Sequence, residues 1–175
     1  MDNNKLTSLD GILQLDGLLK ISAKNNEISG LDFTNSKLRR LEVLSCEKNC
    51  VGWIEGLEEL SNLMSLHLGT DFLNHADVSD DNNLSSFQPK NPMRSLRTLK
   101  LCRNELESFD PKFFLELRTL YLDENQIASF NGIRKLRLLE NFSARSQRGK
   151  SNIGINGLCE LRKVYLSGKF LQILS

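Results

Sequence analysis

The sequence predicts an α/β solenoid, in which short parallel strands stack into a curved sheet on the concave side of the molecule. The first observation behind this prediction is a pattern of apolar residues that recurs along the 175-residue chain at intervals near 22 residues. The second is the order within each copy: two leucines three apart, an apolar residue two further on, and an asparagine three after that. A fixed period with a fixed internal order is the sequence signature of stacked supersecondary units.

Each copy has the form of a leucine-rich repeat. Alternate side chains of a strand point to opposite faces, so Leu99 and Leu101 are expected to face the interior while Lys100 faces solvent. Residues 1–17 form half a repeat, and the chain is predicted to be a single domain over 1–175. The strand-bearing copies begin near Leu18, Leu41, Leu63, Leu96, Leu117, Leu139 and Leu161. No polar cap is visible at either end, which predicts a fragment of a longer protein.

The second half of each repeat predicts turns and short 3₁₀ helices on the convex side. After Asn125, for example, apolar residues follow at Ile127, Phe130 and Ile133, before the next copy begins at Leu139. This segment has room for turns and single 3₁₀ turns rather than for long helices.

A ladder of side-chain amides is expected where each strand turns inward, because an amide can both donate to and accept from buried backbone groups. The ladder positions read from the repeat are Asn26, Asn49, Asp71, Asn104, Asn125, Gln147 and Lys169, and Asn4, 22 residues before Asn26, holds the same position in the half repeat. An ionised aspartate cannot donate, Gln147 carries one extra methylene and a lysine cannot accept, so the ladder is expected to weaken towards the C-terminus. The interval from Leu63 to Leu96 is 33 residues, which places an insertion within 74–95.

The formal net charge of +1 conceals two halves of opposite sign. Residues 1–87 hold 7 Lys/Arg and 14 Asp/Glu, whereas residues 88–175 hold 16 and 8. In the basic half, several outward strand positions carry cations or tyrosines. Arginine pairs with carboxylate or phosphate through two donors and tyrosine adds rigid contact area, so the expected partner is an acidic or phosphorylated protein segment. The predicted contact residues are Lys100, Arg103, Tyr121, Arg145, Lys163 and Tyr165.

A second candidate contact region follows the sixth strand-bearing copy, where the repeat loses its asparagine. Residues 143–151 contain Arg148 and Lys150 in place of the usual apolar pattern. His67 is added to the candidates because it faces the concave side and a histidine can titrate near neutral pH.

The sequence argues against an enzyme. It shows no glycine-rich phosphate loop and no His/Cys set at metal-ligand spacing, and Arg148-Gly149-Lys150-Ser151 lacks the earlier glycine of a phosphate loop. We therefore expect no catalytic residue, metal, cofactor or small-molecule substrate. Nucleic-acid binding is also disfavoured, because Asp123 and Glu124 interrupt the basic strip.

Targeting features favour an intracellular protein. The first 30 residues lack a basic start followed by an apolar run, and no stretch approaches the roughly 18 apolar residues of a membrane span. The four cysteines do not have the spacing of disulfide caps, which favours a reducing compartment. We expect no membrane association.

Two resemblances refine the expected function. The repeat length and order resemble the 22-residue class typified by a regulatory subunit of protein phosphatase 1, a class that bacterial internalins share. Residues 117–127, followed by 139–147 with their Ser-Ala-Arg-Ser-Gln ending, resemble the repeat domain of the fungal spindle-pole-body scaffold, to which animal centriolin is similar. That resemblance implies a non-enzymatic scaffold of the mitotic-exit or septation-initiation network. It would dock signalling and microtubule-anchoring components at the spindle pole body, in the cytoplasm. The alternative that the repeat class implies is a regulatory or targeting subunit of a protein phosphatase.

Overall fold

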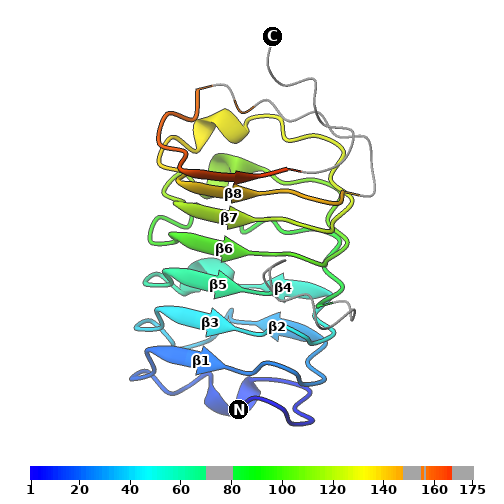
Figure 1. The fold of residues 1–175 in the computed structure, drawn as a ribbon. Coiled ribbons are helices and arrows are strands. Elements are labelled where there is room, and N and C mark those ends of the chain that lie inside the picture. The colour runs from blue at the N-terminus through cyan, green and yellow to red at the C-terminus, as the bar shows by residue number, and fades with distance from the viewer. Residues whose placement is uncertain (70–80, 148–154, 156, 167–175) are drawn as a thin grey trace.

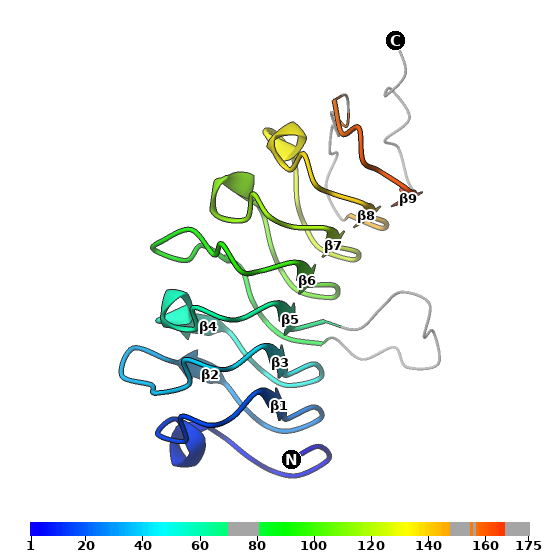
Figure 2. The same ribbon diagram turned by 90° about the vertical axis from the view of Figure 1, so that its left-hand side faces the viewer.

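The computed structural model describes residues 1–69, 81–147, 155 and 157–166. The chain winds into a stack of coils that rises from the N-terminus to the C-terminus, with one strand of a long sheet in each coil (Figure 1). Seen from the side, the strands of the long sheet lie along one side of the stack and the helical turns along the other (Figure 2). The molecule is a leucine-rich-repeat solenoid, as the sequence predicts.

Seven parallel strands form the concave sheet, in the order β1-β3-β5-β6-β7-β8-β9. Their bounds are β1 Lys20–Ser22, β3 Val43–Ser45, β5 Ser65–His67, β6 Thr98–Lys100, β7 Thr119–Tyr121, β8 Asn141–Ser143 and β9 Lys163–Tyr165. Each strand is paired with the next without a shift, so that Leu66 lies opposite Leu99 and Leu99 opposite Leu120. These central leucines are fully buried, because every coil places the same apolar position in the interior.

The convex side carries short 3₁₀ helices and, near the N-terminus, a second sheet. The helices are η1 Asp10–Ile12, η2 Leu57–Glu59, η3 Pro111–Phe113 and η4 Ile133–Lys135. The sequence did not predict the parallel pair formed by β2 Gly30–Asp32 and β4 Trp53–Glu55 (Figure 1). Both strands begin four residues after a ladder asparagine, Asn26 or Asn49.

Aromatic rings replace leucines in the interior of the C-terminal half. Phe114 lies between Phe87 and Phe109, with ring centroids 5.5 and 5.4 Å away, and Phe130 meets Phe142 edge-on at 5.8 Å. Phe114 and Phe142 are fully buried.

The amide ladder forms as expected where asparagines are present. The Asn125 Nδ2 donates to the carbonyls of Leu101, Leu122 and Asp123, and its Oδ1 accepts from the Leu106 N–H at 3.1 Å. Gln147 repeats this arrangement, accepting from the Ile127 N–H and donating to Leu122 and Arg145. The extra methylene of glutamine therefore does not break the ladder, contrary to the weakening expected there. Lys169 lies outside the described residues.

The residue before most ladder positions adopts a left-handed backbone conformation. Its φ lies between 53° and 58° at Asn3, Asn25, Lys48, Arg103, Glu124 and Ser146. Asparagine visits this conformation readily, whereas lysine, arginine and glutamate do so at a steric cost. The ladder amides thus hold a tight inward turn that the local sequence does not favour.

One ladder assignment made from the sequence was wrong. In the third strand-bearing coil the ladder amide belongs to Asn82, whose Nδ2 donates to Cys46 and Leu68 and whose Oδ1 accepts from the Val51 N–H at 2.8 Å. Asp71, the expected ladder residue, lies outside the described residues. The extra residues of this coil therefore come between Leu68 and Asn82, before the ladder position rather than after it.

Candidate functional site

The paired strands bring the predicted concave residues into columns. The central outward column runs, in register, through Ser22, Ser45, His67, Lys100, Tyr121, Ser143 and Tyr165. Lys163 lies in the neighbouring column, opposite Asn141, and is exposed. Arg148 and Lys150, the secondary candidates, lie outside the described residues.

Two cations lie over tyrosine rings at the C-terminal end of these columns. The Lys100 Nζ is 5.6 Å from the centroid of the Tyr121 ring on the next strand. The Arg145 guanidinium carbon is 5.1 Å from the centroid of the Tyr165 ring. These contacts hold each cation over a ring face, which is attractive electrostatically and orders both side chains. This part of the concave surface therefore consists of ordered pairs of one cation and one aromatic ring.

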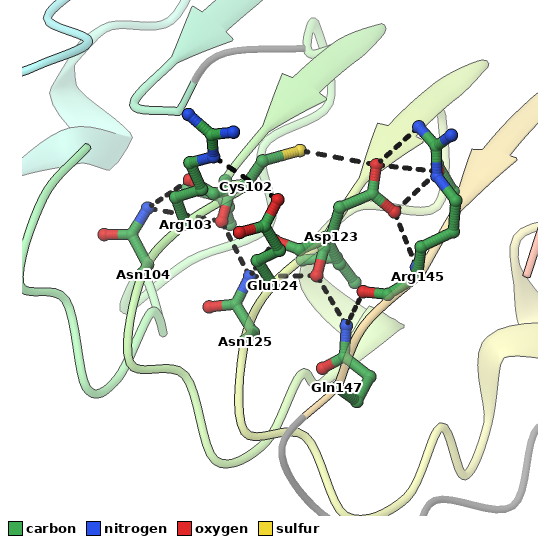
Figure 3. Close-up of polar contacts among 11 residues, drawn as sticks. Cys102, Arg103, Asn104, Asp123, Glu124, Asn125, Arg145 and Gln147 are labelled. Atoms are coloured by element: carbon green, nitrogen blue, oxygen red, sulfur yellow. Dashed lines mark hydrogen bonds and ion pairs between the residues drawn. The ribbon is translucent and has the colours of Figure 1, made fainter. Parts of the chain in front are cut away.

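Asp123 organises the strands around Arg145 (Figure 3). Its carboxylate, 1% exposed, accepts from the Ser143 hydroxyl at 2.6 and 2.8 Å, from the Arg145 N–H at 2.6 Å and from Arg145 Nη2 at 3.1 Å. The Cys102 thiol approaches its Oδ2 at 4.0 Å. A buried carboxylate needs such partners because desolvation otherwise disfavours its charge. Arg145 therefore serves partly to compensate Asp123.

Arg103 is compensated in the same way. Its Nε lies 3.3 Å from Glu124 Oε1, and its side chain is only 10% exposed (Figure 3). The six predicted contact residues thus fall into two groups, two that pair with carboxylates and four that lie on the strands. The charges of Arg103 and Arg145 are offset by carboxylates of the next or preceding coil, and the concave strip is less basic than the sequence alone suggested. Lys100, Tyr121, Lys163 and Tyr165 lie on the paired strands themselves.

The role of Asp123 was not predicted from the sequence, although the chain contains a recurring signal for it. Asp2 makes the equivalent contacts at the other end of the solenoid: it accepts from the Ser22 hydroxyl at 2.7 Å and from the Lys24 N–H at 2.9 Å. In both cases an Asp two residues before a ladder asparagine meets a Ser-Ala-Lys or Ser-Ala-Arg segment one coil later. The hydrogen bond from the Ser22 hydroxyl is the main reason why the pKa of Asp2 lies below its ordinary value.

The N-terminal half of the concave face carries a polar cluster around Glu47. The Lys24 Nζ lies 2.8 Å and the His67 Nδ1 3.7 Å from the same oxygen, Glu47 Oε1. The Ser45 hydroxyl is 3.5 Å from that same His67 nitrogen. A proton relay from serine through histidine to a carboxylate needs both ring nitrogens, one for each partner. This cluster therefore has the composition of a catalytic triad without its geometry.

The environment of Glu47 predicts that the fold loses stability in acid. Burial raises the pKa of Glu47, but hydrogen bonds from His67 and Lys24 outweigh it and hold that pKa below its ordinary value of 4.5. A pKa that is lower in the folded state contributes stability above the unfolded pKa, and this is lost as pH falls through the folded pKa. The urea midpoint should therefore fall as pH drops from about 5 to about 3, and Glu47→Gln should flatten part of that fall. The exposed Glu27→Gln serves as the control; coincident pH curves for wild type and Glu47→Gln would contradict the assignment.

Other chemical features of the described residues point to packing rather than reactivity. Burial raises the pKa of the Cys46 thiol to about 12, so this inward cysteine behaves as a small apolar side chain. No group of three or more His, Cys, Asp or Glu side chains suited to a metal ion occurs within the part of the chain that the structure describes. Across that same part, no helix has the length and apolar character needed to cross a membrane.

Two proteins of similar sequence are informative. The chain is 42% identical over 144 residues to the septation initiation network scaffold protein cdc11 of Schizosaccharomyces pombe, a match that covers 82% of this chain but only 13% of that protein. It is 26% identical over 162 residues to lumican of Oryctolagus cuniculus, covering 83% of this chain and 80% of that one. No protein-family model matches the sequence.

Solved structures share the architecture. An internalin, inlF, from Listeria monocytogenes superimposes with a TM-score of 0.77 at 18% identity, over 94% of this chain and 47% of that chain. Internalin C2 from the same species has a TM-score of 0.62 at 21% identity, over 94% of this chain and 78% of that chain. At these identities the likeness is one of fold. The chain is a leucine-rich-repeat solenoid, a fold whose extended concave surface suits protein–protein interaction.

Proposed function

We propose that this chain is a non-enzymatic scaffold domain that docks signalling and microtubule-anchoring components at the spindle pole body, in the cytoplasm, during mitotic exit. The observation that carries the proposal is the 42% identity to a septation-network scaffold over 82% of the chain. The identity is well above that to the internalins, with which the chain shares a fold.

The concave strands β6 to β9 supply the proposed contact surface. Lys100 and Tyr121 are in register on adjacent strands, and Tyr165 lies further along the same column with Arg145 over its ring. Rigid aromatic area flanked by cations suits an acidic or phosphorylated protein segment, since each ring contributes contact area at little cost in side-chain entropy. Arg103 and Arg145 support this surface by clamping neighbouring coils together.

A domain exchange tests the cellular role. The matching segment of cdc11 in Schizosaccharomyces pombe is replaced with this chain, and septation is scored together with the position of the fluorescently tagged chimera. The chimera should support septation and concentrate at the spindle pole body. A stable chimera that does neither would overturn the proposal. Capture of a protein phosphatase catalytic subunit by the chimera would instead support the regulatory-subunit alternative.

Charge reversal tests the concave surface in vitro. The probe is a serine-phosphorylated peptide flanked by aspartates, with its alanine counterpart as the reference. Lys100→Glu combined with Lys163→Glu should weaken binding by about tenfold or more, because like charges would then face each other. Both lysines lie on strands of the sheet, so Lys37→Glu, exposed and outside those strands, is the matched control. Equal affinity of the double variant and the control would exclude this surface.

A further inference from the structure

The convex sheet ends abruptly at β4. Strand β4 pairs with β2, and no third strand of the described structure joins the pair. The inward side chains show the consequence: Leu31 on β2 is 2% exposed, whereas its register partner Ile54 on β4 is only half-buried. The side of Ile54 that faces away from β2 is therefore incompletely covered.

The backbone of β4 has hydrogen-bonding groups directed at this open side. The Glu55 carbonyl accepts from the Phe33 N–H at 2.9 Å, so the polar groups of Glu55 point towards β2. Neighbouring residues of a strand direct these groups to opposite edges, which turns the Ile54 N–H and C=O away from β2. An edge of this kind is a template for another strand.

The next coil does not supply that strand. Residues 86–88 follow Asn82 at the same distance at which Trp53–Glu55 follow Asn49, yet they form no strand and Pro89 directly after them has no N–H. A groove of about 290 Å³ separates the two coils, lined by Trp53, Ile54 and Glu58 on one side and by Phe87, Pro89 and Lys90 on the other.

On the β4 side of the groove, opposite Lys90, the outer surface carries carboxylates and one large aromatic ring. Trp53 is 51% exposed and lies against Gly30, where a Cβ would overlap the ring. The outward residues Asp32 and Glu55 occupy the strand ends beyond it. The hydroxyl and N–H of Thr34 lower the pKa of Asp32, which keeps this carboxylate charged.

We propose that the β4 edge is a second binding site, which takes an extended segment of a partner protein as a third strand, with lysine or arginine at alternate positions. Backbone bonds to Ile54 would hold the segment, and its basic side chains would lie beside Glu55 and Glu58. A second copy of this chain is a poorer occupant. Pairing two β4 edges would bring Glu55 and Glu58 of each copy close to their counterparts, and like charges across paired strands are destabilising.

The fluorescence of Trp53 reports on this site alone, because it is the single tryptophan of the sequence. The probe is a heptapeptide of alternating lysine and valine, titrated into the intact chain. Its binding should change the Trp53 emission saturably, whereas the corresponding glutamate–valine peptide should leave it unchanged. No change with the lysine peptide, or the same change with both, would overturn the proposal.

Backbone pairing is tested with two further peptides, N-methylated at alternate amides in the two possible phases. Only one set of amides can face β4, so one peptide should bind about tenfold or more weakly and the other should retain affinity. Equal behaviour of the two would exclude strand addition. Glu55→Lys should weaken the lysine peptide by a similar factor, and the exposed Glu27→Lys should not. An emission change that follows protein concentration without peptide would instead identify a second copy as the occupant.

Discussion

Replacing Asn125 with leucine should lower the free energy of unfolding by about 3 kcal/mol, the cost of stranding several buried backbone groups at once. The Asn125 side chain is fully buried and serves one N–H, that of Leu106, and three carbonyl groups. Leucine has nearly the same volume but can neither donate nor accept. The expected loss is therefore one of hydrogen bonding rather than of packing. Urea unfolding monitored by circular dichroism measures it.

Asn62 provides the matched control for this substitution. Its amide also donates to a backbone carbonyl, that of Arg39 at 2.7 Å, but the side chain is exposed. Water can replace that bond, so Asn62→Leu should change the free energy of unfolding by no more than about 0.5 kcal/mol. If Asn125→Leu proved as mild as Asn62→Leu, the ladder would contribute nothing to stability.

Gly69→Ala should be at least as damaging, with an expected loss of about 3 kcal/mol or more from steric overlap. Gly69 lies two residues beyond the end of β5, against Cys102, which lies two residues beyond the end of β6. A Cβ there would overlap the N and O atoms of Cys102 and lie 2.8 Å from its carbonyl carbon. All three are backbone atoms, so no side-chain rotation relieves the overlap and the two coils must move apart.

Gly52→Ala separates this steric effect from the general effect of adding a methyl group. A Cβ on Gly52 would meet only the Ser29 carbonyl oxygen, at 4.0 Å. The urea midpoint of Gly52→Ala should stay near that of the wild type, while Gly69→Ala should unfold at a much lower urea concentration. Equal midpoints would show that the coils around Gly69 adjust without cost.

The fold was predictable because one rule determines most of the interior. The positions of each copy that face the interior are apolar, as at Leu96, Leu99 and Leu101. Alternate residues of a strand face opposite sides, and this alternation correctly placed Lys100, Tyr121 and Tyr165 in one outward column. The second sheet was not predictable in this way. Gly30 and Trp53 show no alternating pattern of their own, and they are extended because neighbouring coils offer backbone partners.

The chemistry of the concave site was only half visible in the sequence. The position of a residue in a column gives the direction of its side chain but not its partner. Arg145 is neutralised by Asp123, a residue 22 positions earlier that, in the sequence alone, only interrupts the basic strip. Arg103 and Glu124 are separated by a similar interval. Such pairs are formed by stacking, so they become apparent only once the register between coils is known.

The position of Asn82 has a consequence for how this protein can vary. Because that amide completes the ladder after a segment longer than in any other coil, the register of β6 against β5 is set by contacts in space and not by the number of residues between Gly69 and Asp81. A coil of this solenoid can therefore hold more residues than its neighbours while the strands on either side of it keep the common register.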